Sequence, residues 1–124
     1  MMSHEEFEQA VMNKLLEGED EIFTRLREQY TNANVTSREF TGCGFFTYFD
    51  VDVELRYNNI NGRIDDVMAE ITNCNEEYLF FILYIENGKF DVLECFTTLD
   101  SWNYDYGNTN IKFCYEDKRV FEIS

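Results

Sequence analysis

Residues 78–97, YLFFILYIENGKFDVLECFT, decide the fold, because two long apolar runs flank an Asn-Gly pair. Asn-Gly is the preferred dipeptide of a type I′ turn, in which both turn residues take a positive φ. The stretch therefore predicts a β-hairpin with a two-residue loop. In that register Glu86 lies opposite Lys89, and the opposite charges beside the turn agree with this. Further from the turn, Leu83 is expected opposite Val92.

The same register makes a prediction about one carboxylate. It places Glu94 opposite Phe81, on the more apolar face of the hairpin. If that face is the core, desolvation would raise the pKa of Glu94 unless a cation such as Arg38 or Arg56 compensates. Two interpretations are open: a structural ion pair or sheet-edge acid, and a ligand-binding or catalytic carboxylate in a pocket lined by nearby phenylalanines (Phe45, Phe49 and Phe81).

The first 31 residues have a helical pattern. Ser3 followed by Glu6 is typical of a capping box, and apolar residues then recur near helical spacing, with acids on the other face. Gly18 interrupts the pattern at a cost of about 1 kcal/mol relative to alanine. The segment is either one bent helix or two helices that meet at Gly18, and two helices are favoured.

After residue 34 the apolar period changes from 3.6 to 2, which indicates strands. Residues 45–57 predict one long strand whose odd positions face the core, and residues 35–41 predict a strand joined to it through glycines 42 and 44. Residues 67–71 form part of a further strand, and residues 111–115 and 119–123 are expected to pair around 116–118. The fold class is therefore α+β: an N-terminal helical segment packed on a mainly antiparallel β-meander sheet of five to seven strands.

Length and composition indicate a single domain over residues 1–124, since there is no proline and no linker-like segment. The N-terminus lacks the basic and apolar regions of a secretory signal, and the longest apolar run, 78–85, is too short to span a membrane. A cytoplasmic protein is expected. The four cysteines lie far apart, so reduced, buried thiols are favoured over two disulfides.

Charge is the strongest compositional feature. Twenty-five acids against ten bases give a net charge of −15, spread along the whole chain. Such a surface repels nucleic acid and anionic membranes and favours a protein partner with a basic surface. Solubility alone is the other explanation for the acidity.

Residues 100–108, DSWNYDYGN, predict a partner-binding loop. They combine Trp102, Tyr104 and Tyr106 with Asp100 and Asp105. Tryptophan and tyrosine are enriched in binding hot spots, and the aspartates would favour lysine or arginine on a partner. The alternative is that the indole folds back over the end of the sheet and the two tyrosines follow it.

A second candidate surface lies on the hairpin itself. Tyr78, Phe80, Ile82 and Tyr84 share one face of the first hairpin strand. If the helical segment covers the opposite face, this apolar face is expected to meet another chain. A structural homodimer through this face is therefore one alternative function.

Few residues are suited to catalysis. His4 is the only histidine and is expected in a frayed terminus, so no interior imidazole serves a Ser-His-Asp or Cys-His system. Neither a metal site nor a phosphate-binding glycine loop is predicted, because residues 42–44 lack the third glycine and precede a strand. No cofactor is expected. Carboxylate chemistry remains open, so the sequence leans towards a protein that is not an enzyme without deciding it.

Two segments carry a resemblance. REFTGCGFFT (38–47) and IENGKFDVLECFT (85–97) resemble a group of small bacterial α+β proteins with the pattern GxGFFT…IENGKxDxLExxT. The resemblance covers about residues 20–102, and Cys95 and Phe96 replace the Gly-Tyr pair of that group. The group in turn resembles toxin-immunity proteins in size and acidity, which implies no catalytic residues.

The function expected from the sequence is a non-catalytic protein-binding module, immunity-like, that masks a basic partner with an acidic and aromatic surface. The alternatives are a small-ligand binder or carboxylate enzyme around Glu94 and the structural homodimer.

Overall fold

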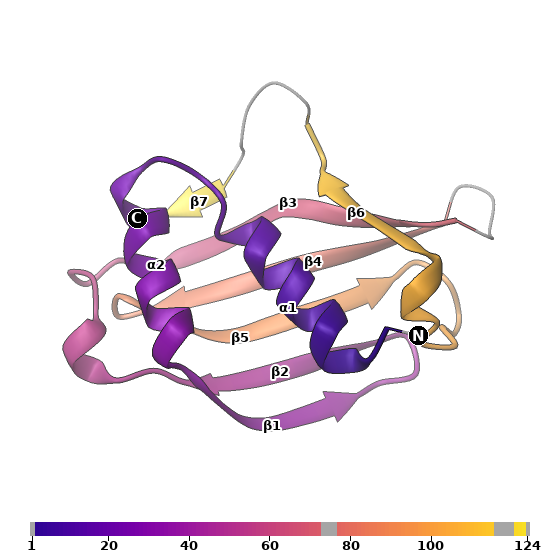
Figure 1. Cartoon of the computed structure of the whole chain (residues 1–124), viewed down its shortest axis with the longest axis horizontal. Helices are drawn as coiled ribbons and strands as arrows, with labels where there is room; N and C mark the ends of the chain where they lie inside the picture. The colour runs from indigo at the N-terminus through magenta and orange to yellow at the C-terminus, as the bar shows by residue number, and fades with distance from the viewer. Residues whose placement is uncertain (1, 73–76, 116–120, 124) are drawn as a thin grey trace.

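Two helices cover one face of an antiparallel sheet (Figure 1). The computed structural model describes residues 2–72, 77–115 and 121–123. The helices are α1 (His4–Leu15) and α2 (Glu21–Asn32). The strands are β1 (Asn34–Phe40), β2 (Gly44–Asp50), β3 (Gly62–Ile71), β4 (Tyr78–Glu86), β5 (Lys89–Thr97), β6 (Thr109–Phe113) and β7 (Phe121–Ile123), with short 3-10 helices η1 (Val53–Leu55) and η2 (Tyr106–Asn108) between them. The predicted α+β class is confirmed.

The helical segment contains two helices, as favoured. The capping box begins α1: the Ser3 hydroxyl accepts from the Glu6 amide at 3.1 Å, and the Glu6 carboxylate accepts from the Ser3 amide at 3.1 Å. Gly18 lies between the helices with φ +148°, and a Cβ there would come within 2.5 Å of the Phe23 ring. The chain can reverse here because glycine adopts this conformation without a steric penalty.

The strand order is β1-β2-β5-β4-β3-β6, with β7 also beside β3. The chain therefore crosses from β2 to β3 past the position of the hairpin, so spatial order departs from chain order. The expected pairing of residues 111–115 with 119–123 is wrong, because β6 and β7 each pair with β3, at Val67–Ile71 and Gly62–Ile64 respectively. Residues 116–118, the predicted turn of that pair, and residues 119–120 lie outside the described residues.

The predicted strand over residues 45–57 is too long. Strand β2 ends at Asp50, and the Asp52 carboxylate then caps η1 by accepting from the Glu54 amide at 2.9 Å. Odd positions 45 to 51 face the core as predicted, but Val53 is 58% exposed. The apolar alternation of the sequence continues past the end of the strand, so the pattern alone does not show where strand pairing stops.

The hairpin has the predicted turn. Asn87 and Gly88 have φ of 52° and 79°, and Glu86 lies opposite Lys89. Beyond the turn the register shifts: Ile85 pairs with Phe90, but Tyr84 pairs with Val92. Asp91 is thus an extra residue, a β-bulge, and the predicted pairing of Leu83 with Val92 is wrong.

This bulge reverses the faces of β5. A one-residue slip moves every later side chain to the other side of the sheet. Leu93, Cys95 and Thr97 consequently point into the core, while Glu94 lies opposite Ile82 on the outer face. The placement of Glu94 opposite Phe81 is wrong for this reason.

The core fills the space between the helices and the inner face of the sheet. It includes one fully buried amide, Gln29 on α2. Its nitrogen donates to the carbonyls of Gly88 at 2.8 Å and Leu55 at 3.1 Å, and its oxygen accepts from the Phe90 amide at 3.2 Å. These bonds satisfy the amide and attach α2 to the hairpin turn and η1.

Three of the cysteines, Cys43, Cys95 and Cys114, are free thiols, and Cys74 lies outside the described residues. Burial raises the pKa of the Cys95 thiol well above its usual range, so that thiol is protonated and inert. In the described ranges, neither helix has the length and apolar character needed to cross a bilayer.

Candidate functional sites

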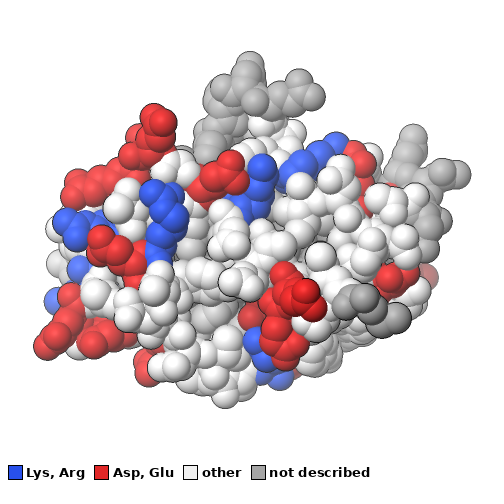
Figure 2. Space-filling model, viewed as in Figure 1, with Lys and Arg blue, Asp and Glu red and all other residues white. Residues whose placement is uncertain are grey.

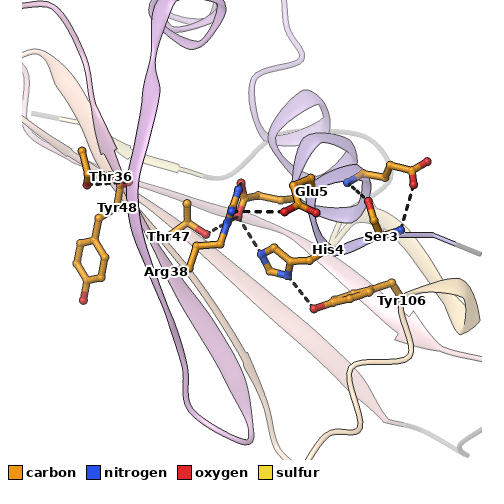
Figure 3. A network of polar contacts seen from close by, with 10 residues as sticks. Ser3, His4, Glu5, Thr36, Arg38, Thr47, Tyr48 and Tyr106 are labelled. Carbon is orange, nitrogen blue, oxygen red and sulfur yellow. Dashed lines mark hydrogen bonds and ion pairs between the residues drawn. The ribbon is translucent and has the colours of Figure 1, made fainter.

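A buried polar cluster joins α1 to the edge of the sheet (Figure 3). Its centre is Glu8 on α1, whose side chain is 5% exposed. Arg38 on β1 donates two hydrogen bonds to the two carboxylate oxygens, from Nη2 at 2.9 Å and from Nε at 3.0 Å. The Thr47 hydroxyl on β2 donates to the same carboxylate at 2.5 Å.

His4 extends this cluster towards the loop before η2. Its Nε2 donates to Glu8 at 3.1 Å, and its Nδ1 accepts from the Tyr106 hydroxyl at 2.7 Å in the neutral imidazole. The ring packs edge-on against Phe40 and Phe45, at centroid distances of 5.0 and 4.6 Å. The side chain is 11% exposed, so the expectation of a frayed terminus at His4 is wrong.

The cluster strongly favours the ionised form of Glu8. Burial alone would raise the pKa of Glu8, but hydrogen bonds from His4, Arg38 and Thr47 outweigh it and lower the pKa from 4.5 to about 2. The hydrogen bonds that Arg38 donates to Glu8 in turn raise the pKa of Arg38. Burial, with the nearby Tyr104, raises the pKa of Tyr106 to about 12, so its hydroxyl remains a donor.

This arrangement suits a structural brace better than a catalyst. A general base works best with a pKa near the ambient pH, whereas Glu8 is ionised far below it and both its oxygens already accept hydrogen bonds. An open hollow of about 490 Å³ adjoins the cluster, with Tyr30, Asn13 and Phe49 among its lining residues. One sign of the cluster is visible in the sequence, because His4 and Glu8 are four residues apart on one helix. The expectation that the acids of α1 lie on its solvent side is wrong for Glu8.

Glu94 occupies a different environment from the predicted one. It is half-buried on the outer face and accepts from the Tyr84 hydroxyl at 2.7 Å. Arg38, its expected partner, is on the other side of the sheet with Glu8. The phenylalanines predicted to share a pocket with Glu94 are in the core, so the pocket of that hypothesis does not form.

The loop of residues 100–108 lies against the helix side of the molecule. Trp102 is 5% exposed, and its ring centroid is 6.0 Å from that of Phe7 and 4.8 Å from that of Tyr104. The Tyr104 hydroxyl donates to the Gly44 carbonyl at 2.8 Å and accepts from the Gly42 amide at 2.7 Å. The Trp102 indole therefore folds back over the end of the sheet, which is the alternative interpretation of this loop. Of the two aspartates predicted to bind a partner, Asp100 is exposed and Asp105 is half-buried.

An acidic end is formed where α2 meets η1. Figure 2 shows carboxylates over this end of the helix side, with Lys and Arg side chains among them. An open hollow of about 730 Å³ lies there, with Val51 and Leu55 among its apolar lining and three carboxylates, Asp50, Asp52 and Glu54. Lys89, its one lysine, donates to the Val51 carbonyl at 3.2 Å. The sequence pattern hid this site, because residues 50–55 were assigned to a strand.

The third feature is the outer face of the sheet. Nine apolar or aromatic side chains point away from the helices across four adjacent strands, and we call this set the aromatic face: Phe46, Tyr48, Met68, Tyr78, Phe80, Ile82, Tyr84, Val92 and Phe96. Phe80 and Phe96 pack at a centroid distance of 5.7 Å, and Phe96 is 36% exposed. Both helices lie on the opposite face (Figure 1).

Comparison of the chain with protein-family models, curated proteins and solved structures gives no match. In the ranges that the structure describes, no group of three or more His, Cys, Asp or Glu side chains is arranged to hold a metal ion.

Proposed function

We propose that this protein is a non-catalytic protein-binding module that masks a basic partner, as an immunity protein masks its toxin. The observation that carries the proposal is the acidic hollow beside η1. It combines three exposed carboxylates with an apolar lining, and the exposed Val53 stands between two of the acids.

This geometry suits an arginine or lysine side chain. The aliphatic stem of such a side chain can lie along Val53 and Leu55 while its charged group meets the carboxylates. Arginine is favoured, because its planar group binds carboxylates in a bidentate way. The net charge of −15 adds long-range attraction that would speed the encounter with a basic surface.

The cluster around Glu8 supports a non-catalytic function. Its carboxylate and imidazole are engaged with one another and with Arg38, Thr47 and Tyr106. The aromatic residues of the 100–108 loop serve packing, so the proposed partner site is the hollow and not that loop.

The proposal is tested by charge reversal. The double variant Asp50→Lys/Glu54→Lys reverses two exposed acids of the hollow and leaves the Asp52 cap intact. We expect the partner captured by the wild type to bind this variant at least about tenfold more weakly, about 1.4 kcal/mol, and wild-type binding to weaken as salt is raised. Binding is measured by isothermal titration calorimetry with the purified partner.

The matched control is Glu19→Lys/Asp100→Lys, which makes the same charge change at exposed residues outside the hollow. It should retain affinity within about threefold, since distant charges are screened. Equal losses in the two variants, or a partner whose binding is insensitive to salt, would contradict the proposal.

A further inference from the structure

We propose that the aromatic face is a self-association surface, on which two copies of this chain stack sheet against sheet around a twofold axis. This inference is separate from the proposed function, because it uses the side of the sheet away from the helices and does not involve the acidic hollow.

The distribution of charge is the first reason to expect a second copy of this chain on the aromatic face. A basic partner would be drawn to the acidic end, whereas the aromatic face encloses one carboxylate, Glu94. The charges that border the face on β3 and β6 are already paired: Arg63 with Asp65 at 3.3 Å, and Lys112 with Glu70. A nearly uncharged aromatic surface is best matched by a surface of the same kind, and a twofold axis presents the face to itself.

The repulsion between two chains of −15 does not prevent this arrangement. The two helices and the segment that joins them, residues 4–32, carry eight of the 25 acids, and the helices lie on the opposite side of each sheet (Figure 1). Stacked sheets are about 10 Å apart, and a helix layer adds about as much again on each side. Charges on the two helix layers are thus separated by more than the Debye length of about 8 Å at physiological salt.

Strand order also favours one axis. With the axis parallel to the strands and between β4 and β5, the β1 edge of one copy faces the β6 edge of the other. Glu39, which borders the face on β1, would then approach the Lys112 edge of the second copy. The alternative axis, across the strands, would set each edge over itself and bring like charges together.

The area is sufficient for a weak dimer. The four strands of the aromatic face, about 4.8 Å apart, span about 14 Å, and Tyr78 to Tyr84 spans about 20 Å along the strand, or about 290 Å² in projection. The flanking strands β1 and β6 widen the stacked area to about 500 Å². Stable interfaces bury about 600 to 1,000 Å² of accessible surface per partner, and accessible area exceeds projected area because the side chains stand out from the sheet. Sheets of this kind pack at about −30° with interlocking side chains.

Glu94 is expected to weaken the dimer. It stays close to the axis, and its Tyr84 hydrogen bond only partly offsets the loss of water around an ionised carboxylate. Glu94→Gln should therefore strengthen association, whereas Phe80→Lys should abolish it. Glu19→Gln, the same change at an exposed residue on the helix side, is the matched control and should leave association unchanged within about twofold.

The experiment is sedimentation equilibrium of the full chain from about 1 µM to about 1 mM, the range expected for an interface of this size. We expect a reversible monomer–dimer equilibrium, at least about fivefold tighter in Glu94→Gln and lost in Phe80→Lys. Circular dichroism confirms that each variant is folded, and Ile82→Lys replaces Phe80→Lys if the latter is not. A wild type that is monomeric over the whole range, or a dimer that the folded lysine variants leave intact, overturns the proposal; so does a dimer that Glu94→Gln weakens.

The two proposals fail separately. Asp50→Lys/Glu54→Lys should leave the dimer intact, because neither residue belongs to the aromatic face. A dimer lost in that variant but kept in Phe80→Lys would place self-association at the acidic end and overturn the assignment to the sheet.

Discussion

Two glutamates on opposite faces of one sheet show how differently a fold can treat the same side chain. On the helix side, Glu8 is almost fully buried, accepts from Arg38, Thr47 and His4, and has a pKa of about 2. On the outer side, Glu94 is half-buried and accepts from the Tyr84 hydroxyl. A carboxylate can therefore be buried where several hydrogen-bond donors converge on it. On the outer face, water provides most of the hydrogen bonds that protein donors provide in the interior.

The bulge at Asp91 places Glu94 on the outer face, so its removal should have the largest effect on stability. Deletion of Asp91 would continue the turn register and turn Glu94 into the core while Leu93 and Cys95 turn out of it. We expect a loss of at least about 4 kcal/mol in the free energy of unfolding, or failure to fold, because a carboxylate would be buried without donors. Urea denaturation measures this loss. A deletion variant as stable as the wild type would show that the bulge does not set the faces.

The pH dependence of stability tests the buried member of this pair, Glu8. The folded-state pKa of Glu8 lies below its unfolded value of 4.5, so its stabilising effect is complete above about pH 4.5 and is lost as the pH falls towards 2. We expect about 2 kcal/mol of the free energy of unfolding to disappear over this window, and Glu8→Gln to remove that part of the dependence.

Both proteins are measured at concentrations low enough to keep the chain monomeric. An acid limb of the stability curve that Glu8→Gln leaves unchanged would show that the cluster does not hold Glu8 ionised.

Two tyrosine hydroxyls provide the finest comparison. Tyr106→Phe removes the donor to the buried His4, and Tyr84→Phe removes the donor to the half-exposed Glu94. We expect losses of about 1 kcal/mol and about 0.3 kcal/mol respectively, because an unpaired group inside the protein cannot turn to water. Chemical denaturation of both variants checks the order, and a larger loss in Tyr84→Phe would reverse it.

Prediction from sequence succeeded where local chemistry decides the structure. The capping box at Ser3, the break at Gly18 and the turn at Asn87-Gly88 each depend on residues close together in the chain. It failed where distant segments decide. The end of β2 depends on where its neighbours stop pairing, and the places of β6 and β7 depend on which edge β3 leaves open.

The candidate sites divide in the same way. Acidity and an apolar outer face on β4 were readable from composition and alternation, and residues 78, 80, 82 and 84 do point away from the helices. The cluster at Glu8 unites four elements, α1, β1, β2 and η2, and no local pattern connects them. The acidic hollow appeared only when the chain left the sheet at Asp50.

The N-terminal helical segment and its division in two, the hairpin turn and the negative charge follow from the sequence alone, because each arises from neighbouring residues or from their sum. Tertiary structure alone decided which carboxylate is buried and which faces outward. One extra residue in β5 exchanges the inner and outer faces of that strand. Where this residue is accommodated depends on hydrogen bonding, core packing and exposure to solvent in the whole fold.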